Sequence, residues 1–395
     1  MIKINKTFPK KFIEEYIQFA LDTVLWPNIF NFLKSVPHTH HKLMSTIFNK
    51  CLLETLLRSK PESFENIIKR LYRFLPFLAE RYCYSYLLDE INISKNIISL
   101  DLTSLAGRQS LENIIALTCI ELRKLTTKYS LYLTPSIISG LESNISLYKK
   151  KKILCRLENA KRGGSQITEK DQALFPNWVN EFAKCFDYDR IAKKFGQSIT
   201  ELLDLTVCPY CALESIQTYS TISVRPDLDH FYPKTRFPFL AISLYNLIPA
   251  GTVCNQKHKR NNTMLGHMHP YLEGLEHENM FRFGFLPDGN IRTTFRIDIL
   301  TQSTQSKNKN IDLFKVKGLY NENEDLREWF FNTYELREFL KAEGQELSLI
   351  DFLSPRNKHV VDINRPNTKV SGQKFKVEAL NDLFGQNLNI VAQPE

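Results

Sequence analysis

The chain has 395 residues, 43% of them hydrophobic and 24% charged, which predicts a soluble protein of two or three domains with a sizeable core. No apolar run is long enough to span a bilayer, and Lys10 and Lys11 precede a helical pattern rather than a signal-peptide core, so we expect a cytoplasmic protein with no membrane partner. Lysine and arginine total 52 against 43 acidic residues, a net charge of +9 that favours a polyanionic partner.

Residues 1 to about 157 show apolar side chains at helical spacing, as in Leu111, Ile114, Ile115, Thr118 and Leu122. This pattern predicts an all-helical domain over residues 1–160, whose chemistry the sequence does not indicate. A group of histidines follows Pro37 in a predicted loop and has no nearby acidic or thiol partner, so we expect no metal there: His38, His40 and His41.

A polar stretch with two glycines, residues 161–166, breaks the helical pattern and is the best candidate for a domain boundary or hinge. Helical spacing resumes over about 178–195 and leads into a central region, which we take to extend over residues 161–280. Five cysteines stand singly, mostly within helical apolar patterns, and are expected to be reduced core thiols: Cys51, Cys83, Cys119, Cys155 and Cys185.

The remaining residues, 281–395, are predicted to form an α+β extension that packs on the central region. Alternating apolar residues over 281–285 and 291–299, with turn chemistry at 287–290, predict a β-hairpin. A helix is expected from about Glu324 to Lys341, with acidic residues in its first turn. The predicted fold class is therefore α+β, mainly α.

The chemistry is concentrated between Cys208 and His258. Asp229 and His230 follow a strand-like stretch and precede Pro233, which permits the strand to end there. The aspartate offers a hard oxygen to a divalent cation, and a neutral imidazole can take a proton from water.

A second short strand is predicted over residues 247–249, after Asn246. Gly251 and Thr252 then form a turn and a possible cap for a short helix over 253–264 that carries Asn255. The predicted order is strand, loop, strand and helix, which would place Asn255 opposite Asp229.

These residues resemble the HNH nucleases, the ββα-metal family, over about fifty residues from Cys208 to His258. The resemblance implies that Asp229 and Asn255 are metal ligands, that His230 is the general base, and that Asn246 steadies the loop carrying the base. The strings at 229–234, 246–249 and 269–271 resemble a bacterial subgroup found in anti-phage defence loci, including Septu-type nucleases that work with an ATPase.

Many members of the family carry two Cys-x-x-Cys pairs that bind structural zinc. The first pair is present as Cys208 and Cys211, whereas the second retains only Cys254, because position 251 is glycine. His258 could complete the zinc site or could join the catalytic metal, roles that we expect to exclude one another. His267 and His269 are further zinc candidates; loss of zinc, or a redox role for the first pair, stays open.

The function implied by the resemblance is a metal-dependent endonuclease that hydrolyses phosphodiester bonds of DNA. Oxygen ligands favour Mg²⁺ or Mn²⁺, and participation of His258 would favour Ni²⁺ or Zn²⁺. Several basic residues near the motif are expected to contact the DNA backbone: Lys234, Lys257, Lys259 and Arg260. Lys234 and Arg236 are phosphate contacts or, alternatively, solvated surface. The alternative is a catalytically degenerate HNH fold that binds nucleic acid or serves as a scaffold subunit.

Overall fold

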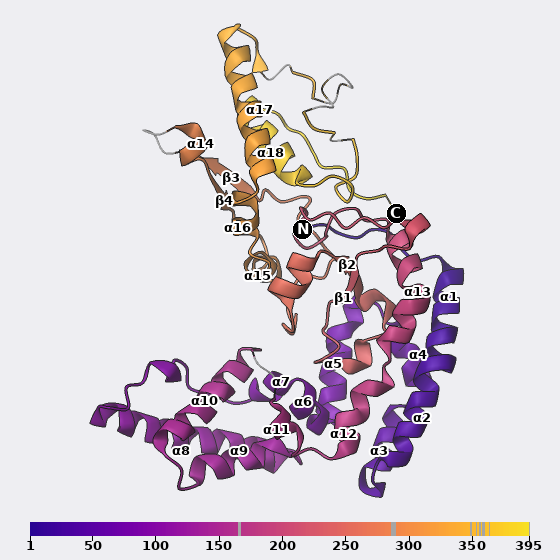
Figure 1. The fold of residues 1–395 in the computed structure, drawn as a ribbon, viewed down its shortest axis with the longest axis vertical. Helices are drawn as coiled ribbons and strands as arrows, with labels where there is room; N and C mark the ends of the chain where they lie inside the picture. Colours follow the sequence, from indigo (N-terminus) through magenta and orange to yellow (C-terminus); the bar gives the residue numbers. More distant parts are fainter. Residues whose placement is uncertain are drawn as a thin grey trace.

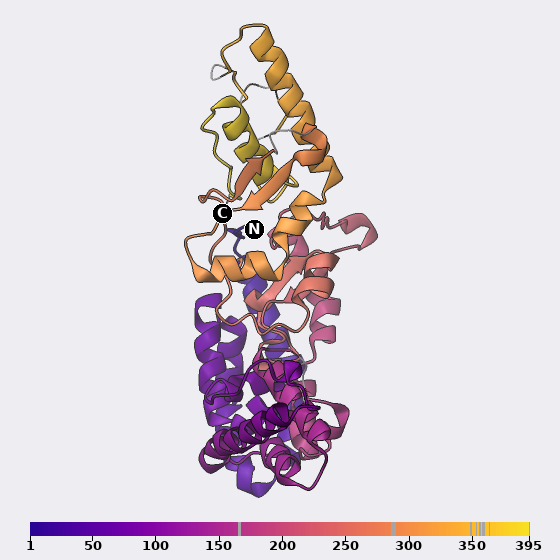
Figure 2. The same ribbon diagram turned by 90° about the vertical axis from the view of Figure 1, so that its left-hand side faces the viewer.

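The computed structural model describes residues 1–164, 167–285, 290–347, 350–352, 354, 357, 360–362 and 364–394. In this part of the chain the fold is mainly helical and contains two separate two-stranded antiparallel sheets (Figure 1). A view turned by 90° shows an elongated molecule, with indigo and purple N-terminal helices towards one end and the orange C-terminal helices towards the other (Figure 2). None of the helices in the described ranges is both long enough and apolar enough to cross a membrane.

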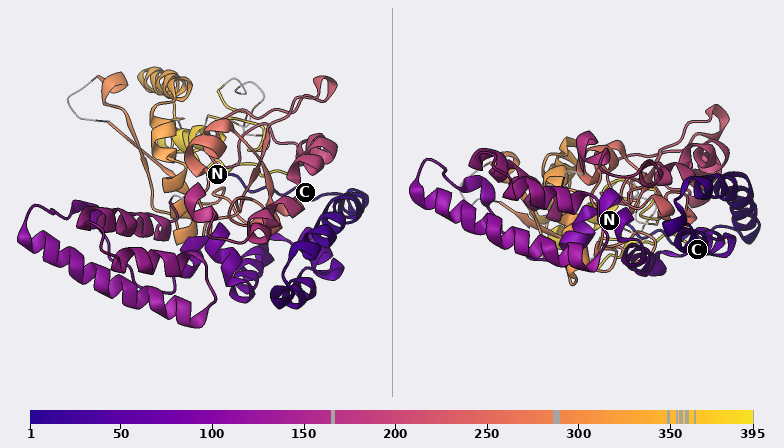
Figure 3. Two further views of the ribbon diagram at one scale, coloured as in Figure 1. Left: turned by 60° about the horizontal axis from the view of Figure 1, so that its bottom comes forward. Right: turned by 90° about the horizontal axis from the view of Figure 1, so that it is seen from below.

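The helices before residue 162 confirm the helical prediction. They are α1 Lys10–Phe19, a π-helix Ala20–Leu25, α2 Trp26–Ser35, α3 His38–Ile47, α4 Lys50–Arg58, α5 Pro61–Phe74, α6 Pro76–Tyr82, α7 Tyr84–Leu88, a 3₁₀ turn Ile97–Ser99, α8 Leu105–Lys128, α9 Leu133–Glu142 and α10 Leu147–Lys161. Proline begins α5 and α6, where its missing N–H costs nothing. Helices α8, α9 and α10 extend to one side of the molecule (Figure 3).

Two details of this region differ from the sequence prediction. The histidines after Pro37 are not in a loop, since α3 begins at His38, and the His40 ring packs 5.3 Å from that of Trp178. The first residues of the chain do not lie with the helices. Instead, the N–H of Ile2 donates to Pro209 O at 2.9 Å and the N–H of Ile4 donates to Pro270 O at 2.8 Å, so this segment packs on the central region.

The segment between α10 and the central region is helical but interrupted. It comprises α11 Glu169–Gln172, α12 Asn177–Glu181, a 3₁₀ turn Phe182–Cys185 and α13 Tyr188–Leu203. The helical stretch predicted over 178–195 is therefore split before Asp187, whose side chain caps α13, and α13 continues to Leu203. The predicted boundary coincides with the end of α10, after which Gly163 has a positive φ of 77°.

The N-terminal helices cover the loop that joins the two central strands. The Tyr16 hydroxyl of α1 donates to Ile242 O at 2.9 Å, and the Ser243 hydroxyl donates to Leu56 O of α4 at 2.9 Å. The Tyr72 hydroxyl of α5 donates to the carbonyl of Arg236. The helical region is thus in direct contact with the loop on which the candidate site depends.

The C-terminal hairpin is confirmed, although its second strand is shorter than predicted. Strand β3 Phe281–Gly284 pairs with β4 Arg296–Ile299, with Phe281 opposite Ile299. Residues 291–294 form the short helix α14 Ile291–Thr294, capped by the side chain of Asn290, rather than part of the strand. The predicted turn lies largely outside the described residues.

The remaining helices pack against this hairpin. They are α15 Gln305–Leu313, α16 Val316–Asn321, α17 Glu324–Ala342 and α18 Gln373–Phe384. The predicted helix from Glu324 is confirmed as α17, and its Phe330 ring stacks 4.2 Å from that of Phe295. Most buried apolar residues of these regions belong to one large cluster, and Ile2, Val207 and Ala212 form a separate small one.

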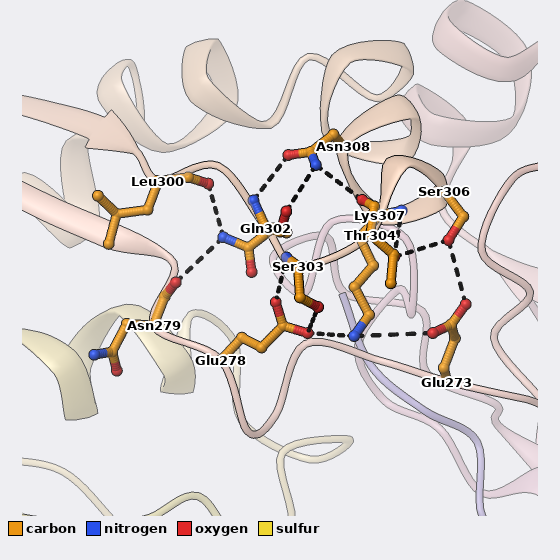
Figure 4. Close-up of polar contacts among 10 residues, drawn as sticks. All are labelled: Glu273, Glu278, Asn279, Leu300, Gln302, Ser303, Thr304, Ser306, Lys307 and Asn308. Carbon is orange, nitrogen blue, oxygen red and sulfur yellow. Dashed lines mark hydrogen bonds and ion pairs between the residues drawn. The ribbon is translucent and has the colours of Figure 1, made fainter.

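Hydrogen bonds and ion pairs join α15 to the segments that flank the hairpin (Figure 4). The Glu278 carboxylate accepts hydrogen bonds from the Ser303 N–H at 2.9 Å and from the Ser303 hydroxyl at 2.8 Å, and it forms an ion pair with Lys307. The hydrogen bond from Lys307 makes the largest contribution, and together these partners lower the pKa of Glu278 to about 2. The Gln302 amide donates to Leu300 O at 2.7 Å, which closes the end of β4.

Candidate functional site

The central sheet presents the predicted order of strand, loop, strand and helix. Strand β1 Asp227–His230 pairs antiparallel with β2 Leu247–Ala250, with Asp229 opposite Ile248 and His230 opposite Leu247. The following helix is a π-helix, Val253–Lys259, and ends before the predicted Met264. Its i→i+5 pattern appears in the bond from the Arg260 N–H to Asn255 O at 3.0 Å.

Asp229 is held between a tyrosine and a lysine. The Tyr210 hydroxyl donates to Asp229 Oδ2 at 2.6 Å, and Lys259 Nζ donates to Asp229 Oδ1 at 3.0 Å. The Lys259 ammonium also donates to His230 O at 2.6 Å, and 1% of its side chain is exposed. Burial lowers the pKa of Lys259, whereas the neighbouring Asp229 raises it.

The position of Lys259 corrects one expectation from the sequence. A residue that contacts the DNA backbone must present its charge to solvent, but the ammonium of Lys259 is buried against Asp229. Lys259 is therefore the partner of the central carboxylate and not a surface contact. Pairing of this kind is the usual condition for burying a charged lysine.

His230 ends β1 and its ring is oriented by the backbone. Nε2 lies 2.9 Å from Ala241 O, and because a carbonyl oxygen only accepts, Nε2 carries the proton and Nδ1 carries the lone pair. The ring of Tyr188 lies edge-on with a centroid distance of 4.4 Å. Burial, with smaller effects of Lys234 and Lys259, lowers the pKa of His230 to about 3, so the imidazole is neutral at physiological pH.

Asn246 braces the loop between the strands. Its Oδ1 accepts from the Tyr232 N–H at 2.8 Å, and its Nδ2 donates to Tyr232 O at 3.0 Å and to Leu240 O at 2.9 Å. The side chain is fully buried, so these bonds are shielded from water. Leu240 precedes Ala241, the acceptor for His230, and Asn246 consequently steadies the group that orients the imidazole.

Asn255 and His258 are half-buried on the π-helix. The contacts that the described residues make to the Asp229 carboxylate come from Tyr210 and Lys259, and not from Asn255 or His258. Carboxylate and amide oxygens are donors that suit Mg²⁺ or Mn²⁺, so the chemistry of Asp229 and Asn255 fits such a cation. A cation at Asp229 would have to replace the hydrogen bond from Lys259.

The other basic residues that were predicted to contact DNA differ in their exposure to solvent. Lys257 and Arg260 are exposed, and Lys234 is half exposed with Nζ 4.9 Å from the centroid of the Tyr188 ring. Arg236, by contrast, is buried, and its guanidinium donates to Gly163 O at 2.6 Å and Gly164 O at 2.8 Å. Arg236 therefore has a structural role, as a tie between the central loop and the end of α10.

Three of the predicted zinc ligands meet in a buried cluster. The sulfur atoms of Cys208, Cys211 and Cys254 all lie within 4.8 Å of one another, and this group could hold a metal ion. Burial raises the pKa of Cys208, whereas hydrogen bonds from Cys208 and Cys254 lower the pKa of Cys211. Within the described residues, this is the only group of three or more histidine, cysteine or acidic side chains at metal-binding distance.

The candidate histidines do not join the cysteines. His258 lies outside the group, and His267 Nδ1 is 2.9 Å from Asn310 Oδ1. His269 is buried with its ring centroid 4.1 Å from that of Phe231, and burial lowers its pKa to about 3. None of the histidines proposed as a fourth zinc ligand is therefore in position.

An acidic residue that the sequence analysis did not single out lies beside the cluster instead. The Glu214 carboxylate accepts from the Val253 N–H at 3.2 and 3.3 Å, at the start of the π-helix, where the predicted cap Thr252 makes no side-chain bond. Burial raises the pKa of Glu214. The only sequence signal for this role was the position of Glu214, three residues after Cys211.

Comparisons with models of protein families, with curated proteins and with solved structures found no match to this chain.

Proposed function

We propose that this protein is an HNH-type endonuclease that hydrolyses phosphodiester bonds of DNA. The observation that carries the proposal is the arrangement of His230, whose protonated Nε2 is bound to Ala241 O and whose Nδ1 is left as a neutral base. A loop braced by Asn246 maintains this orientation. A general base in catalysis needs such a defined tautomer and orientation.

In the proposed reaction, His230 Nδ1 takes a proton from water as the water oxygen attacks phosphorus and the P–O bond to the leaving group breaks. Asp229 with Asn255, and with His258 if that side chain turns inward, would hold Mg²⁺ or Mn²⁺. Such a cation, when bound, stabilises the charge that develops on the phosphate and the leaving oxygen.

DNA is the proposed substrate, and basic side chains near the site support it. Lys234, Lys257 and Arg260 are accessible and lie on the loop after β1 or at the end of the π-helix. The net charge of +9 adds a general attraction to polyanions. Contacts of this kind bind the backbone with little dependence on base sequence.

The biological setting that we propose is a bacterial anti-phage defence system in the cytoplasm, in which this chain is the effector nuclease and an ATPase is a partner. The resemblance of the strings at 229–234, 246–249 and 269–271 to defence nucleases supports it. We also propose that the cluster of Cys208, Cys211 and Cys254 binds structural Zn²⁺, since three thiols at this spacing are typical ligands for that ion.

The test is cleavage of supercoiled plasmid with Mg²⁺ or Mn²⁺. We expect nicking or linearisation that EDTA abolishes. The His230→Ala variant should lose at least about a hundredfold in rate, because general-base catalysis contributes that much. His277→Ala, which changes an exposed histidine, should retain activity. Full activity of His230→Ala would refute the assignment of the base.

A second candidate is a catalytically degenerate HNH fold that binds nucleic acid as a scaffold. The ion pair between Asp229 and Lys259 favours it, because the lysine already neutralises the carboxylate that would hold the cation. This candidate predicts retardation of DNA in a gel-shift assay by wild-type protein and His230→Ala alike, without cleavage when a candidate ATPase partner and ATP are also present.

A further inference from the structure

The three-cysteine cluster has donors from two segments of the chain. Cys208 and Cys211 lie in the turn before residue 212, and Cys254 lies in the first turn of the π-helix Val253–Lys259. All three are buried and none forms a disulfide. Zinc in a structural site takes four ligands in a tetrahedron, so three thiolates leave one position to fill.

Position 251 is the place where the family pattern has its fourth cysteine, and here another side chain occupies that space. A Cβ built on Gly251 would fall less than 3.0 Å from Oε2, Cδ and Cγ of Glu214. The carboxyl group of Glu214 thus lies where the side chain of residue 251 would project. Only glycine at position 251 leaves room for the Glu214 carboxylate in this place.

Glu214 is also tied to each part of the cluster. Its N–H donates to Cys211 Sγ at 3.4 Å, and its carbonyl accepts from the Cys208 N–H at 2.8 Å. Its carboxylate accepts from the Val253 N–H, next to Cys254. No lysine or arginine of the described residues forms an ion pair with this half-buried acid, whose charge a cation would neutralise.

The Glu214 side chain is partly exposed to solvent. An open depression of about 320 Å³ is lined by Glu214, Asp227, Gly251 and Thr252, among others. The three cysteines are buried and do not line this depression, whereas Glu214 does. Carboxylate oxygen is an established zinc ligand alongside sulfur and nitrogen.

We propose that Glu214 is the fourth zinc ligand, in a site of three thiolates and one carboxylate. The inference rests on the zinc proposed above, but not on nuclease activity. The carboxylate oxygens lie outside the group formed by the three sulfur atoms, so metal binding turns the Glu214 side chain inward from its bond to Val253. Binding also releases the thiol protons.

The first test measures zinc on full-length protein purified under reducing conditions. Wild type should carry one Zn²⁺ per chain, measured by elemental mass spectrometry, and should release it slowly to a chelator. Glu214→Gln should weaken zinc binding by at least about tenfold, the effect of losing a group that supports a metal site. Glu201→Gln, an exposed acid on α13, is the matched control and should behave as wild type.

The second test exchanges the ligand. The double variant E214A/G251C removes the carboxylate and places a fourth thiol in the vacated space. After substitution with Co²⁺, its sulfur-to-metal charge-transfer absorption should exceed that of wild type, and its zinc should resist chelator better. Gly251→Cys alone should fold poorly, because its Cβ would overlap Glu214.

The outcomes separate the two proposals. Wild-type protein without zinc would refute the metal itself and, with it, the role of Glu214. Zinc that is bound equally well by wild type, Glu214→Gln and Glu214→Ala would refute Glu214 while leaving the cysteine site intact. Since neither measurement requires cleavage of DNA, failure of the proposed nuclease activity would affect neither conclusion.

Discussion

The buried ammonium of Lys259 is the strongest electrostatic feature at the residue scale. Transfer of a lysine from water to a protein interior is unfavourable unless partners replace its hydration. Here the hydration of Lys259 Nζ is replaced by hydrogen bonds to Asp229 Oδ1 at 3.0 Å and to His230 O at 2.6 Å. The lysine in turn fixes the carboxylate, whose other oxygen is bound by Tyr210.

We therefore predict a strong coupling between Lys259 and Asp229. Lys259→Met should lower the free energy of unfolding by about 3 kcal/mol, because it leaves the buried carboxylate without its cation. The double variant D229N/K259M should recover part of this loss. Urea denaturation of wild type, D229N, K259M and the double variant measures the coupling, with the exposed Lys257→Met as control. Strictly additive effects would contradict the ion pair.

At the element scale, short helices and strands are anchored by polar side chains at their ends. Helix α15 is joined to the β3–β4 hairpin through Glu278, which accepts from Ser303 and pairs with Lys307 (Figure 4). The charged form of Glu278 is the form that these donors stabilise, and this explains why its pKa falls to about 2.

The pH dependence of this anchor follows from the direction of the shift. A carboxyl group with a lowered pKa in the folded state contributes stability above its unfolded value, here 4.5, and loses that contribution as the pH falls through about 2. Wild type should be more stable than Glu278→Gln at pH 7, and the difference should shrink between about pH 4.5 and 2. Thermal unfolding across this range measures it. A difference independent of pH would contradict the assignment.

At the scale of the whole molecule, the helical region and the central sheet are joined through the loop that follows β1. Arg236 of this loop is buried and bonds the carbonyls of Gly163 and Gly164, at the end of α10. Its own carbonyl accepts from Tyr72 of α5. A partner bound to the helices would thus be mechanically connected to the loop that orients His230.

Removing the guanidinium should loosen this junction. Arg236→Met should lower the free energy of unfolding by about 2 kcal/mol, since the part-buried carbonyls of Gly163 and Gly164 lose a charged donor. It should also increase amide hydrogen exchange over residues 161–164. Arg296→Met, on an exposed arginine of β4, should change neither quantity. Unchanged exchange in Arg236→Met would show that the junction is held by other contacts.

Local sequence patterns predicted the elements whose stability is local. Helix α17 follows from an acidic first turn and helical spacing, and the β3–β4 hairpin follows from alternation. The patterns failed where a side-chain cap decided the boundary. Asn290 starts α14 within the predicted second strand, and Asp187 starts α13 within a predicted continuous helix.

By itself, the sequence determined the order of strand, loop, strand and helix around Asp229, His230 and Asn246, because short-range spacing decides which residues fall at strand ends. Only the tertiary structure decided the partners of these residues. Lys259 is 30 positions from Asp229, and Glu214 is 39 positions from Val253. Burial and hydrogen bonding between such distant residues depend on how the whole chain packs, and no local periodicity encodes them.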